Sequence, residues 1–200
     1  MDQKTIDTYN KLAEEYDTET ADFWDSFPHT FIDRFIALTG GRVLDVGSGP
    51  GRDGLILQKA GLDVVCLDAS SAMVRLSASR GLESVKGDFN ALPFPDESFD
   101  GVWAYTSLLH VPKFEVRKPI VEVHRVLKPD GVFGLGLIEG KEELYLENSG
   151  GMGRPRWFSF YTKNEVEELL TQNGFIMLYF EEFRPKTRNY LNFVFRKARA

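Results

Sequence analysis

Between residues 42 and 138 the sequence alternates short, nearly continuous apolar runs with segments of helical length. Strands that are buried on both faces lose the alternation of apolar and polar side chains, so this pattern indicates a parallel sheet covered by helices. The runs that we interpret as strands span residues 42–46, 63–67, 84–86, 99–104 and 132–138, and the helical segments span 52–60, 70–79 and 119–127. The pattern predicts a doubly wound α/β fold.

The C-terminal part departs from this alternation. Thr162 and Glu165 have the spacing of a capping box, and Gly174 marks the end of the helix that they begin. Two strand-like runs follow at residues 175–180 and 190–195, with about nine polar or turn-forming residues between them. No crossover helix fits there, so the two strands must pair antiparallel. The predicted fold is a mostly parallel, seven-stranded sheet with a C-terminal antiparallel hairpin.

The N-terminal segment carries helical spacing before the first strand. Its apolar positions include Ile6, Tyr9, Ala13 and Tyr16, and phenylalanines recur every fourth residue from 23 to 35. Two or three amphipathic helices, ending at a glycine pair, fit this pattern. We therefore predict an N-terminal helical cap over residues 1–41 and a Rossmann-like domain over residues 42–200.

Composition limits the class of protein. A chain of 200 residues has the size of one domain, and its longest apolar run, residues 132–138, is far shorter than the roughly 20 residues of a membrane-spanning helix. The first ten residues mix charges and lack the apolar core of an export signal. The single cysteine, Cys66, excludes an internal disulfide and a multi-cysteine metal site. These features predict a cytoplasmic protein without a bound metal.

The charge is unevenly distributed. The net charge of −6 argues against the broad basic face of a nucleic-acid-binding protein. Residues 184–200 nevertheless hold six basic side chains and no acidic one. Two interpretations stay open: these cations keep an edge strand and the terminus soluble, or they contact an anionic substrate or RNA.

A glycine-rich turn follows the first predicted strand and opens a helix at residues 43–51. Gly47, Gly49 and Gly51 permit positive φ angles and let a ligand approach the backbone, at the place where α/β sheets bind ligands. Taken alone, the turn could equally serve as a tight connection between strand and helix.

The same turn also satisfies a dinucleotide-binding pattern. Gly49, Gly51 and Gly54 complete GxGxxG, and Asp68 lies 68 − 49 = 19 residues beyond the first of them. However, this frame begins three residues after the strand, and Asp45 precedes the turn. A carboxylate does not favour a pyrophosphate at a helix N-terminus, whereas it favours a ligand with an ammonium group. A nicotinamide-dependent oxidoreductase therefore stays an alternative only.

Two more acids follow the next two strands. Asp68 ends the second strand, where a carboxylate can accept both hydroxyls of a ribose, while Ser70 is the better candidate for capping the next helix. Asp88 follows the third strand and can accept from an exocyclic amine, with Phe89 or Phe94 as an apolar wall for a purine. Together the acids predict an adenosine laid across the carboxyl edge of the sheet.

Five motifs in this order resemble the class I S-adenosylmethionine-dependent methyltransferases, particularly the branch that acts on small molecules. They are Asp45-Val-Gly-Ser-Gly-Pro-Gly51, Leu67-Asp-Ala-Ser-Ser-Ala-Met73, Gly87-Asp-Phe89, Leu92-Pro-Phe-Pro-Asp-Glu-Ser-Phe-Asp100 and Val123-His-Arg-Val-Leu-Lys-Pro-Asp-Gly131. The resemblance covers roughly residues 5 to 182. One departure is Asp130, which stands where the family has a glycine, and aspartate also suits a turn.

The resemblance implies roles for individual residues. It implies that S-adenosyl-L-methionine is the cofactor and that the glycine turn and its acid hold the methionine part. The second acid holds the ribose and the third contacts adenine. The positions that carry these roles are Asp45, Gly47, Gly49, Asp68, Asp88, Phe89 and, against the adenine ring, Met73. In the cap, Tyr9 and Tyr16 resemble the family's cover over the cofactor.

Candidates for the chemistry follow the fourth strand. Methyl transfer is an in-line displacement from an activated sulfonium, so a base is required only if the acceptor must lose a proton. Tyr105, Ser107 and His110 occupy the region where the family places groups near the transferable methyl. His110 is the histidine with a plausible catalytic position, and its alternative role is to hold the loop by hydrogen bonds. We interpret His124 as a packing residue and His29 as a residue beside a helix start.

A segment of about 20 residues, 140–161, follows the fifth strand and has the length of a lid. Its end is rich in aromatic residues and contains Arg154 and Arg156. These side chains either grip a flat or anionic acceptor or form a hydrophobic plug.

The predicted function is methyl transfer to an oxygen or nitrogen nucleophile of a small molecule. The alternatives are a tRNA-modifying methyltransferase, favoured by the basic C-terminal stretch and the Leu-Leu-His-Val segment at residues 108–111, a nicotinamide oxidoreductase, and a cofactor-binding protein without turnover.

Overall fold

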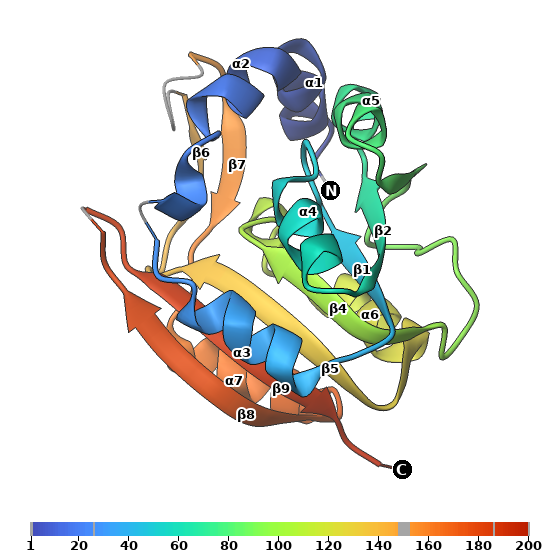
Figure 1. Cartoon of the computed structure of the whole chain (residues 1–200). Coiled ribbons are helices and arrows are strands. Elements are labelled where there is room, and N and C mark those ends of the chain that lie inside the picture. Colours follow the sequence, from blue (N-terminus) through green and yellow to red (C-terminus); the bar gives the residue numbers. More distant parts are fainter. Residues whose placement is uncertain (1, 26, 148–152, 186, 200) are drawn as a thin grey trace.

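The computed structural model describes residues 2–25, 27–147, 153–185 and 187–199. Its centre is a seven-stranded sheet in the order β3-β2-β1-β4-β5-β9-β8 (Figure 1). The strands are β1 (Arg42–Val46), β2 (Asp63–Asp68), β3 (Glu83–Lys86), β4 (Phe99–Tyr105), β5 (Leu127–Ile138), β8 (Phe175–Phe183) and β9 (Tyr190–Lys197). Within this sheet β9 runs antiparallel to both of its neighbours, and the other pairs are parallel. The predicted fold class is confirmed.

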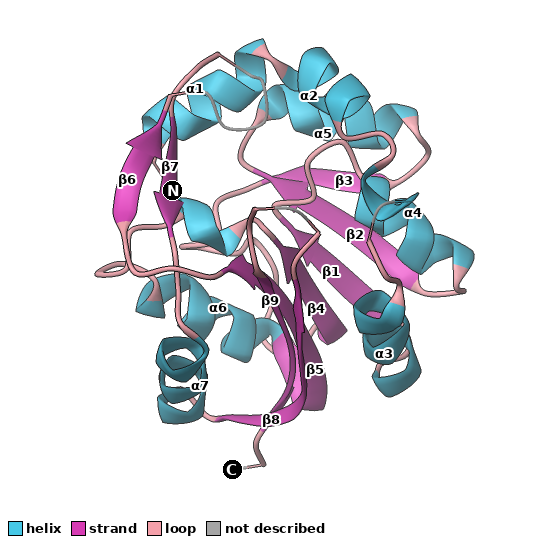
Figure 2. Ribbon diagram, turned by 90° about the vertical axis from the view of Figure 1, so that its left-hand side faces the viewer, coloured by secondary structure: helices cyan, strands magenta, loops and turns pink. Residues whose placement is uncertain are grey.

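Helices cover both faces of the sheet. They are α3 (Thr30–Leu38), α4 (Arg52–Lys59), α5 (Ser71–Ser79), α6 (Arg117–Val126) and α7 (Lys163–Gln172). Figure 2 shows α3 and α4 on one face and α6 and α7 on the other. The predicted capping box of α7 is present, with Thr162 and Glu165 bonding each other's backbone, and Gly174 takes φ +83° just beyond the helix.

Each face of the sheet has its own aromatic core. Phe31, Phe35 and Trp103 are fully buried on the α3 side, and Phe133 and Phe193 are fully buried on the α6 side. Replacing one of these rings with alanine costs about 3–5 kcal/mol in a typical core. The sheet is therefore a firm base for the residues at its carboxyl edge.

Strand β5 differs from the prediction. It begins at Leu127 instead of residue 132, and the predicted helix 119–127 is observed as α6, two residues earlier at its start. The pairing with β4 jumps from Phe99 with Leu127 to Gly101 with Val132. Asp130, at φ +61°, lies in the turn that this jump accommodates. The turn at Asp130 therefore lies within β5, whereas the sequence analysis placed it before the strand.

The N-terminal elements α1 (Gln3–Lys11) and α2 (Ala13–Glu19), followed by the short helix η1 (Phe23–Asp25), lie over the carboxyl ends of the parallel strands. Beside α1 stands a separate hairpin of β6 (Glu143–Leu146) and β7 (Arg156–Ser159), which comes from the predicted lid segment. The Trp157 N–H donates to Thr5 Oγ1 at 2.9 Å and Thr8 Oγ1 donates to the Pro155 carbonyl at 2.9 Å. Residues 148–152 of that segment lie outside the described residues. We call α1, α2 and this hairpin the roof.

The basic C-terminal stretch does not lie on an edge strand. Most of it belongs to β9, which is an inner strand, and to the hairpin before it, whereas the edge strand is β8. Arg184 lies 3.6 Å from Glu139 and Arg199 lies 2.6 Å from Asp130. Lys186 lies outside the described residues. The interpretation that these cations protect an edge strand is wrong, because the hairpin returns the chain to the middle of the sheet.

No helix in the described part of the chain is long and apolar enough to cross a membrane. The same part contains no group of three or more metal-ligating side chains.

Candidate active site

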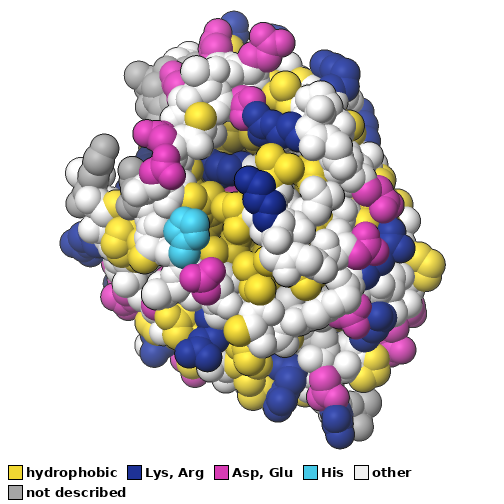
Figure 3. All heavy atoms as spheres, in the orientation of Figure 1, with side chains coloured by type: hydrophobic (Ala, Val, Ile, Leu, Met, Phe, Trp, Pro, Cys, Tyr) yellow, Lys and Arg dark blue, Asp and Glu magenta, His cyan; other side chains and the backbone are white. Residues whose placement is uncertain are grey.

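A cleft lies at the carboxyl ends of β1, β2 and β4, beneath the roof. Its volume, including the part open to solvent, is about 580 Å³. Figure 3 shows this region as a hollow bordered by hydrophobic and basic side chains. Eleven of the twelve predicted site residues line the cleft, namely Tyr9, Tyr16, Asp45, Gly47, Gly49, Asp68, Met73, Phe89, Tyr105, Ser107 and His110. The topology thus brings together residues that are up to 101 positions apart in the sequence.

The glycine turn forms the floor of the cleft. Gly47 and Gly49 have φ angles of +70° and +55°, which disfavour any side chain with a Cβ atom. A Cβ atom at Gly47 would also collide with the side chain of Ser107, whereas one at Gly49 would meet only the Tyr16 ring at 3.9 Å. Gly47 therefore permits close packing against β4, and Gly49 leaves open space beside the cleft.

Asp68 is held by the backbone at both carboxylate oxygens. The Gly49 N–H donates to Oδ2 at 2.9 Å and the Ser70 N–H donates to Oδ1 at 2.8 Å. The side chain is 8% exposed, and this burial raises its pKa to about 6 although the backbone donors act in the opposite direction. Each oxygen keeps lone-pair capacity for one more donor. Ser70 caps α5, as predicted, by accepting from the Met73 N–H.

Asp45 is the second buried acid of the floor. Its Oδ2 atom has no hydrogen-bond partner in the described part of the chain. Burial raises the pKa of Asp45 well above its usual value, and the carboxylates of Asp53 and Asp68 add to this effect. A buried acceptor without a partner is costly, so this oxygen marks a position where a donor from a ligand is favoured.

Arg52 and Asp53 also line the cleft, and the sequence analysis did not select them. Asp53 accepts hydrogen bonds from the indole N–H groups of Trp24, at 2.8 Å, and Trp103, at 2.9 Å. Arg52 lies 3.1 Å from the Asp53 carboxylate and donates to the Thr20 carbonyl. The pair ties the cap to the sheet. The signal that could have found it is an adjacent Arg-Asp at the start of the helix after the glycine turn.

The end of the cleft beside α5 is apolar. Met73 and Phe89 line it and are 1% exposed each. Asp88 does not line the cleft, and its Oδ1 atom accepts from the Asn90 N–H at 3.0 Å. The structure thus brings two of the three residues predicted to contact adenine to the cleft, while Asp88 stands beside it in a turn.

The turn after β4 holds a strained residue. Thr106 has φ +52°, which is unfavourable for a β-branched side chain, and its N–H donates to the Gly136 carbonyl at 2.9 Å. Ser107 donates to the Val46 carbonyl at 2.7 Å, which joins this turn to the glycine turn. Thr106 lines the cleft, and no residue pattern in the sequence marks its conformation.

A chain of hydrogen bonds closes the roof over the cleft. Arg156 Nη1 donates to the Tyr9 hydroxyl at 2.8 Å, and that hydroxyl lies 2.8 Å from His110 Nε2. His110 Nδ1 lies 2.5 Å from the Trp157 carbonyl. A carbonyl only accepts, so Nδ1 carries the proton and Nε2 accepts from Tyr9. Burial, with the Arg156 charge adding, lowers the pKa of His110 to about 3, so the ring is neutral.

The other histidines lie outside the cleft. His124 stacks edge to face on Phe175, with ring centroids 5.3 Å apart, and His29 stands at the N-cap of α3. Tyr16 lines the cleft and meets Tyr9 edge to face at 5.3 Å.

Comparison with known proteins supports the resemblance to methyltransferases. Residues 44–135 match the model of a family described as a methyltransferase domain. The match covers just under half of the chain. It spans the glycine turn, the acids at or just after the ends of β1 to β3 and the turn after β4, which together form the floor of the cleft.

Two curated relatives resemble part of this chain. A demethylmenaquinone methyltransferase of Renibacterium salmoninarum is 41% identical over 102 residues, which is 50% of this chain and 42% of the relative. A sterol 24-C-methyltransferase of Gibberella zeae is 38% identical over 107 residues, covering 48% of this chain and 27% of the relative. The chain spans less than half the length of these relatives.

A solved structure extends the likeness of fold to most of the chain. The 1,6-didemethyltoxoflavin-N1-methyltransferase of Burkholderia thailandensis, crystallised with 1,6-didemethyltoxoflavin and S-adenosylhomocysteine, has a TM-score of 0.68 and 21% identity. The match covers 94% of this chain and 88% of that one. The likeness of fold therefore extends to the roof segments as well as the sheet.

Proposed function

We propose that this chain is an S-adenosylmethionine-dependent methyltransferase that transfers a methyl group to an oxygen or nitrogen nucleophile of a small molecule. The observation that carries the proposal is the unpartnered Asp45 Oδ2 atom, which is buried in the floor of the cleft beside an open glycine turn. An ammonium group supplies the donors that this carboxylate lacks, and the methionine part of the cofactor carries such a group.

The remaining floor residues fit the other parts of this cofactor. Asp68 keeps acceptor capacity for the two ribose hydroxyls, because each oxygen now accepts one backbone N–H. Met73 and Phe89 offer apolar walls for a purine, and Gly49 leaves space for a ligand close to the backbone. We propose Asp88 as an adenine contact only through a rotation of its side chain away from Asn90.

The residues of the roof and His110 beneath it orient the reactants and exclude water in this proposal. When bound, the cofactor supplies a methyl group that its sulfonium charge has already activated. The chain then has to orient the two reactants and exclude water, and good orientation can contribute ~7 to 11 kcal/mol. The rings of Tyr9 and Tyr16 exclude water and present aromatic faces that complement a cation. His110 holds Tyr9 and Trp157 in place, so we assign it a positioning role instead of that of a general base.

The acceptor is a small organic molecule in this proposal, as the names of the relatives suggest. Those names give demethylmenaquinone and a sterol, and the solved structure contains 1,6-didemethyltoxoflavin. The sterol enzyme acts on carbon by its name, which favours a carbon acceptor as a second candidate. We place the protein in the cytosol, where the buried thiol of Cys66 stays reduced.

Two experiments test the proposal. Calorimetric titration with S-adenosylhomocysteine and with NADH separates the cofactor classes, and we expect binding of the first alone. Binding of NADH alone contradicts the proposal and supports an oxidoreductase. Transfer of a labelled methyl group to a small-molecule extract, but not to bulk tRNA, is the expected second result. Labelled tRNA supports the nucleic-acid alternative, and cofactor binding without any transfer supports a protein that only binds the cofactor.

A further inference from the structure

One charged group of the proposed cofactor has no partner among Asp45, Asp68 and the apolar walls. The methionine part of S-adenosylmethionine carries an ammonium group and a carboxylate on the same carbon atom. Asp45 matches the ammonium group, but the carboxylate also loses water beneath the roof, and a buried anion without a cationic partner is costly. The cleft therefore has to offer a cation close to Asp45.

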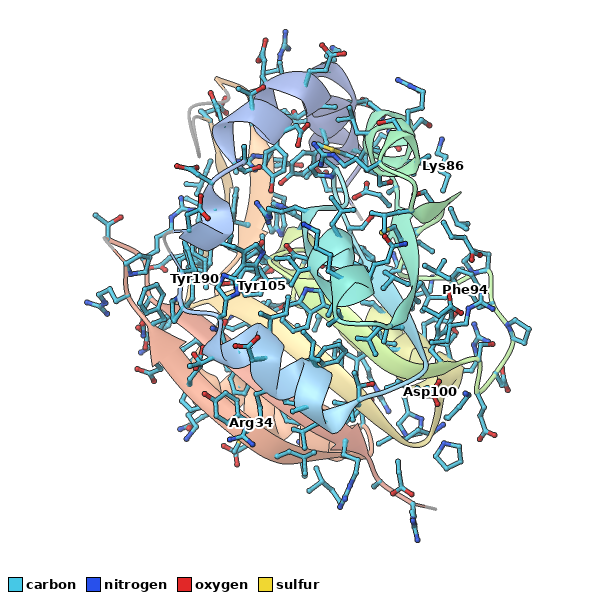
Figure 4. All side chains as sticks on the ribbon, viewed as in Figure 1. Arg34, Lys86, Phe94, Asp100, Tyr105 and Tyr190 are labelled. Atoms are coloured by element: carbon cyan, nitrogen blue, oxygen red, sulfur yellow. The ribbon has the colours of Figure 1, made fainter. Side chains whose placement is uncertain are left out.

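Arg52 is the one permanent cation among the described residues that line the cleft. The other lining residues are acidic or uncharged, because burial lowers the pKa of His110 to about 3 and leaves its ring neutral. Cations elsewhere in the described part of the chain do not line the cleft, and Figure 4 shows two of them, Arg34 and Lys86, well away from Tyr105 of the cleft wall. Arg52 is therefore the candidate partner for the carboxylate.

Arg52 and the unpartnered oxygen of Asp45 lie at the same turn of the fold. A Cβ atom at Gly54 would lie 3.5 Å from Asp45 Oδ2, so this oxygen faces the first turn of α4. Arg52 is the first residue of α4, and its charge acts against the rise in the pKa of Asp45. An amino-acid group beside this turn can place its ammonium group on Asp45 and its carboxylate on Arg52.

The Arg52 guanidinium keeps donors for such a ligand. Nε donates to Asp53 at 3.1 Å and Nη1 donates to the Thr20 carbonyl at 3.2 Å, whereas no hydrogen bond in the described part of the chain uses Nη2. The group lies over the Phe23 ring at 4.3 Å, and the side chain is 19% exposed. Its orientation is therefore set by three contacts, while Nη2 keeps its capacity for a carboxylate.

We propose that Arg52 binds the carboxylate of the cofactor's methionine part through Nη2 while Nη1 keeps holding the Thr20 carbonyl at the end of α2. The cofactor and the N-terminal cap then share one guanidinium group, so the amino-acid end of the cofactor stabilises the end of α2. The inference rests on the proposed function, since it takes S-adenosylmethionine as the cofactor. Arg52 binds and positions here and takes no proton.

The test compares two nucleosides that differ by one carboxylate. They are S-adenosylhomocysteine and decarboxylated S-adenosylhomocysteine, each titrated into the full chain by calorimetry, and the readout is the ratio of their dissociation constants. Arg52→Met removes the charge, and Arg52→Lys keeps the charge without the planar fork. The matched control is Arg80→Met, because Arg80 also holds α2, by donating to Asp17, but does not line the cleft.

We expect the parent to bind S-adenosylhomocysteine about ten- to a hundredfold more tightly than the decarboxylated probe, the equivalent of hydrogen bonds between charged groups. Arg52→Met should bind the two probes nearly equally, and Arg52→Lys should keep part of the preference. In Arg80→Met the ratio should equal that of the parent, because any loosening of α2 affects both probes alike. A full preference in folded Arg52→Met would overturn the inference.

Hydrogen exchange tests the link to the cap. At equal saturation, S-adenosylhomocysteine should protect residues 17–25 of the parent more than the decarboxylated probe does, and Arg52→Met should lose this difference. Equal protection by the two probes in the parent would overturn the link between cofactor and cap.

Failure of the proposed function gives a different pattern. No binding of either probe to the parent would be a failure of the proposed function itself. Binding of both probes to the parent with equal affinity would leave the cofactor class in place and overturn only the role of Arg52. This last comparison needs no variant, so it decides the question even when Arg52→Met does not fold.

Discussion

The floor and the roof of the cleft are built by different means. In the floor, backbone N–H groups of Gly49 and Ser70 fix Asp68, and all the groups involved lie within about 20 residues of one another in sequence. The roof is held by the Tyr9 side chain, which bonds Arg156 of the hairpin and His110 beneath it, each more than a hundred residues away in sequence. Backbone bonds belong to the fold itself, whereas side-chain bonds open without unfolding the sheet. The floor is therefore suited to hold a cofactor and the roof to admit one.

The largest expected effect lies in the floor. Asp68→Ala should weaken S-adenosylhomocysteine binding by ~2 to 4 kcal/mol, because two ribose hydroxyls lose an ionised acceptor. Asp68→Asn keeps one acceptor and should lose less. Calorimetry measures both, with circular dichroism as the check on folding. A folded Asp68→Ala protein that binds within twofold of the parent would contradict the ribose assignment.

The roof should respond to a change that leaves the floor intact. Tyr9→Phe removes the hydroxyl between Arg156 and His110, leaving two buried polar groups without that partner, and should lower the free energy of unfolding by about 1–3 kcal/mol. Thermal melting measures the loss. The control is Tyr16→Phe, because in the described part of the chain the Tyr16 hydroxyl does not link two side chains as the Tyr9 hydroxyl does. Equal melting temperatures for the two variants would mean that the chain does not hold the roof.

The pH dependence of binding sharpens the same comparison. Burial raises the pKa of Asp68 to about 6, so the free protein carries a proton there below that pH, and ribose binding favours the ionised form. Affinity for S-adenosylhomocysteine should therefore fall about tenfold per pH unit below pH 6, with a proton released on binding. Calorimetry in two buffers of different ionisation enthalpy measures the release. In Asp68→Asn the dependence should weaken, and an unchanged profile would assign the titration to another group.

The raised pKa of Asp68 also makes the stability of the fold depend on pH. In the unfolded chain Asp68 ionises near pH 3.8, so between about pH 4 and pH 6 the folded protein holds a proton on Asp68 that the unfolded chain does not. The contribution of Asp68 to stability is therefore present at low pH and is lost as the pH rises through this window. Asp68→Asn should flatten that fall in chemical denaturation.

The smallest expected effect concerns the strained turn between floor and wall. Thr106→Gly relieves a positive φ angle that costs a β-branched residue about 1–2 kcal/mol, but glycine adds about 0.5–1 kcal/mol of unfolded-chain entropy. The net gain in stability should be about 0.5–1 kcal/mol, read from urea denaturation. A loss of stability would mean that the Thr106 side chain makes packing contacts that outweigh the strain.

The two regions also differ in how far the sequence predicts them. The floor follows from local patterns: the apolar runs give the strands, and the residues after them give the glycine turn, Asp45 and Asp68. The roof depends on which side chains meet across the fold, so the bond of Arg156 to Tyr9 leaves no local pattern. The hairpin of β6 and β7 was recognisable as a lid by length alone, without its strands.

Hydrogen exchange with and without S-adenosylhomocysteine tests the central claim most directly, because it follows floor and roof together. If the cleft holds the cofactor beneath the roof, amides in residues 2–25, 140–147 and 153–160 should become protected, while the strands of the sheet change little. Unchanged exchange in residues 2–25 under saturating ligand would contradict the account and leave Tyr9 and Tyr16 as packing residues. Protection of the hairpin that appears only after an acceptor is added would assign it to the substrate instead of the cofactor.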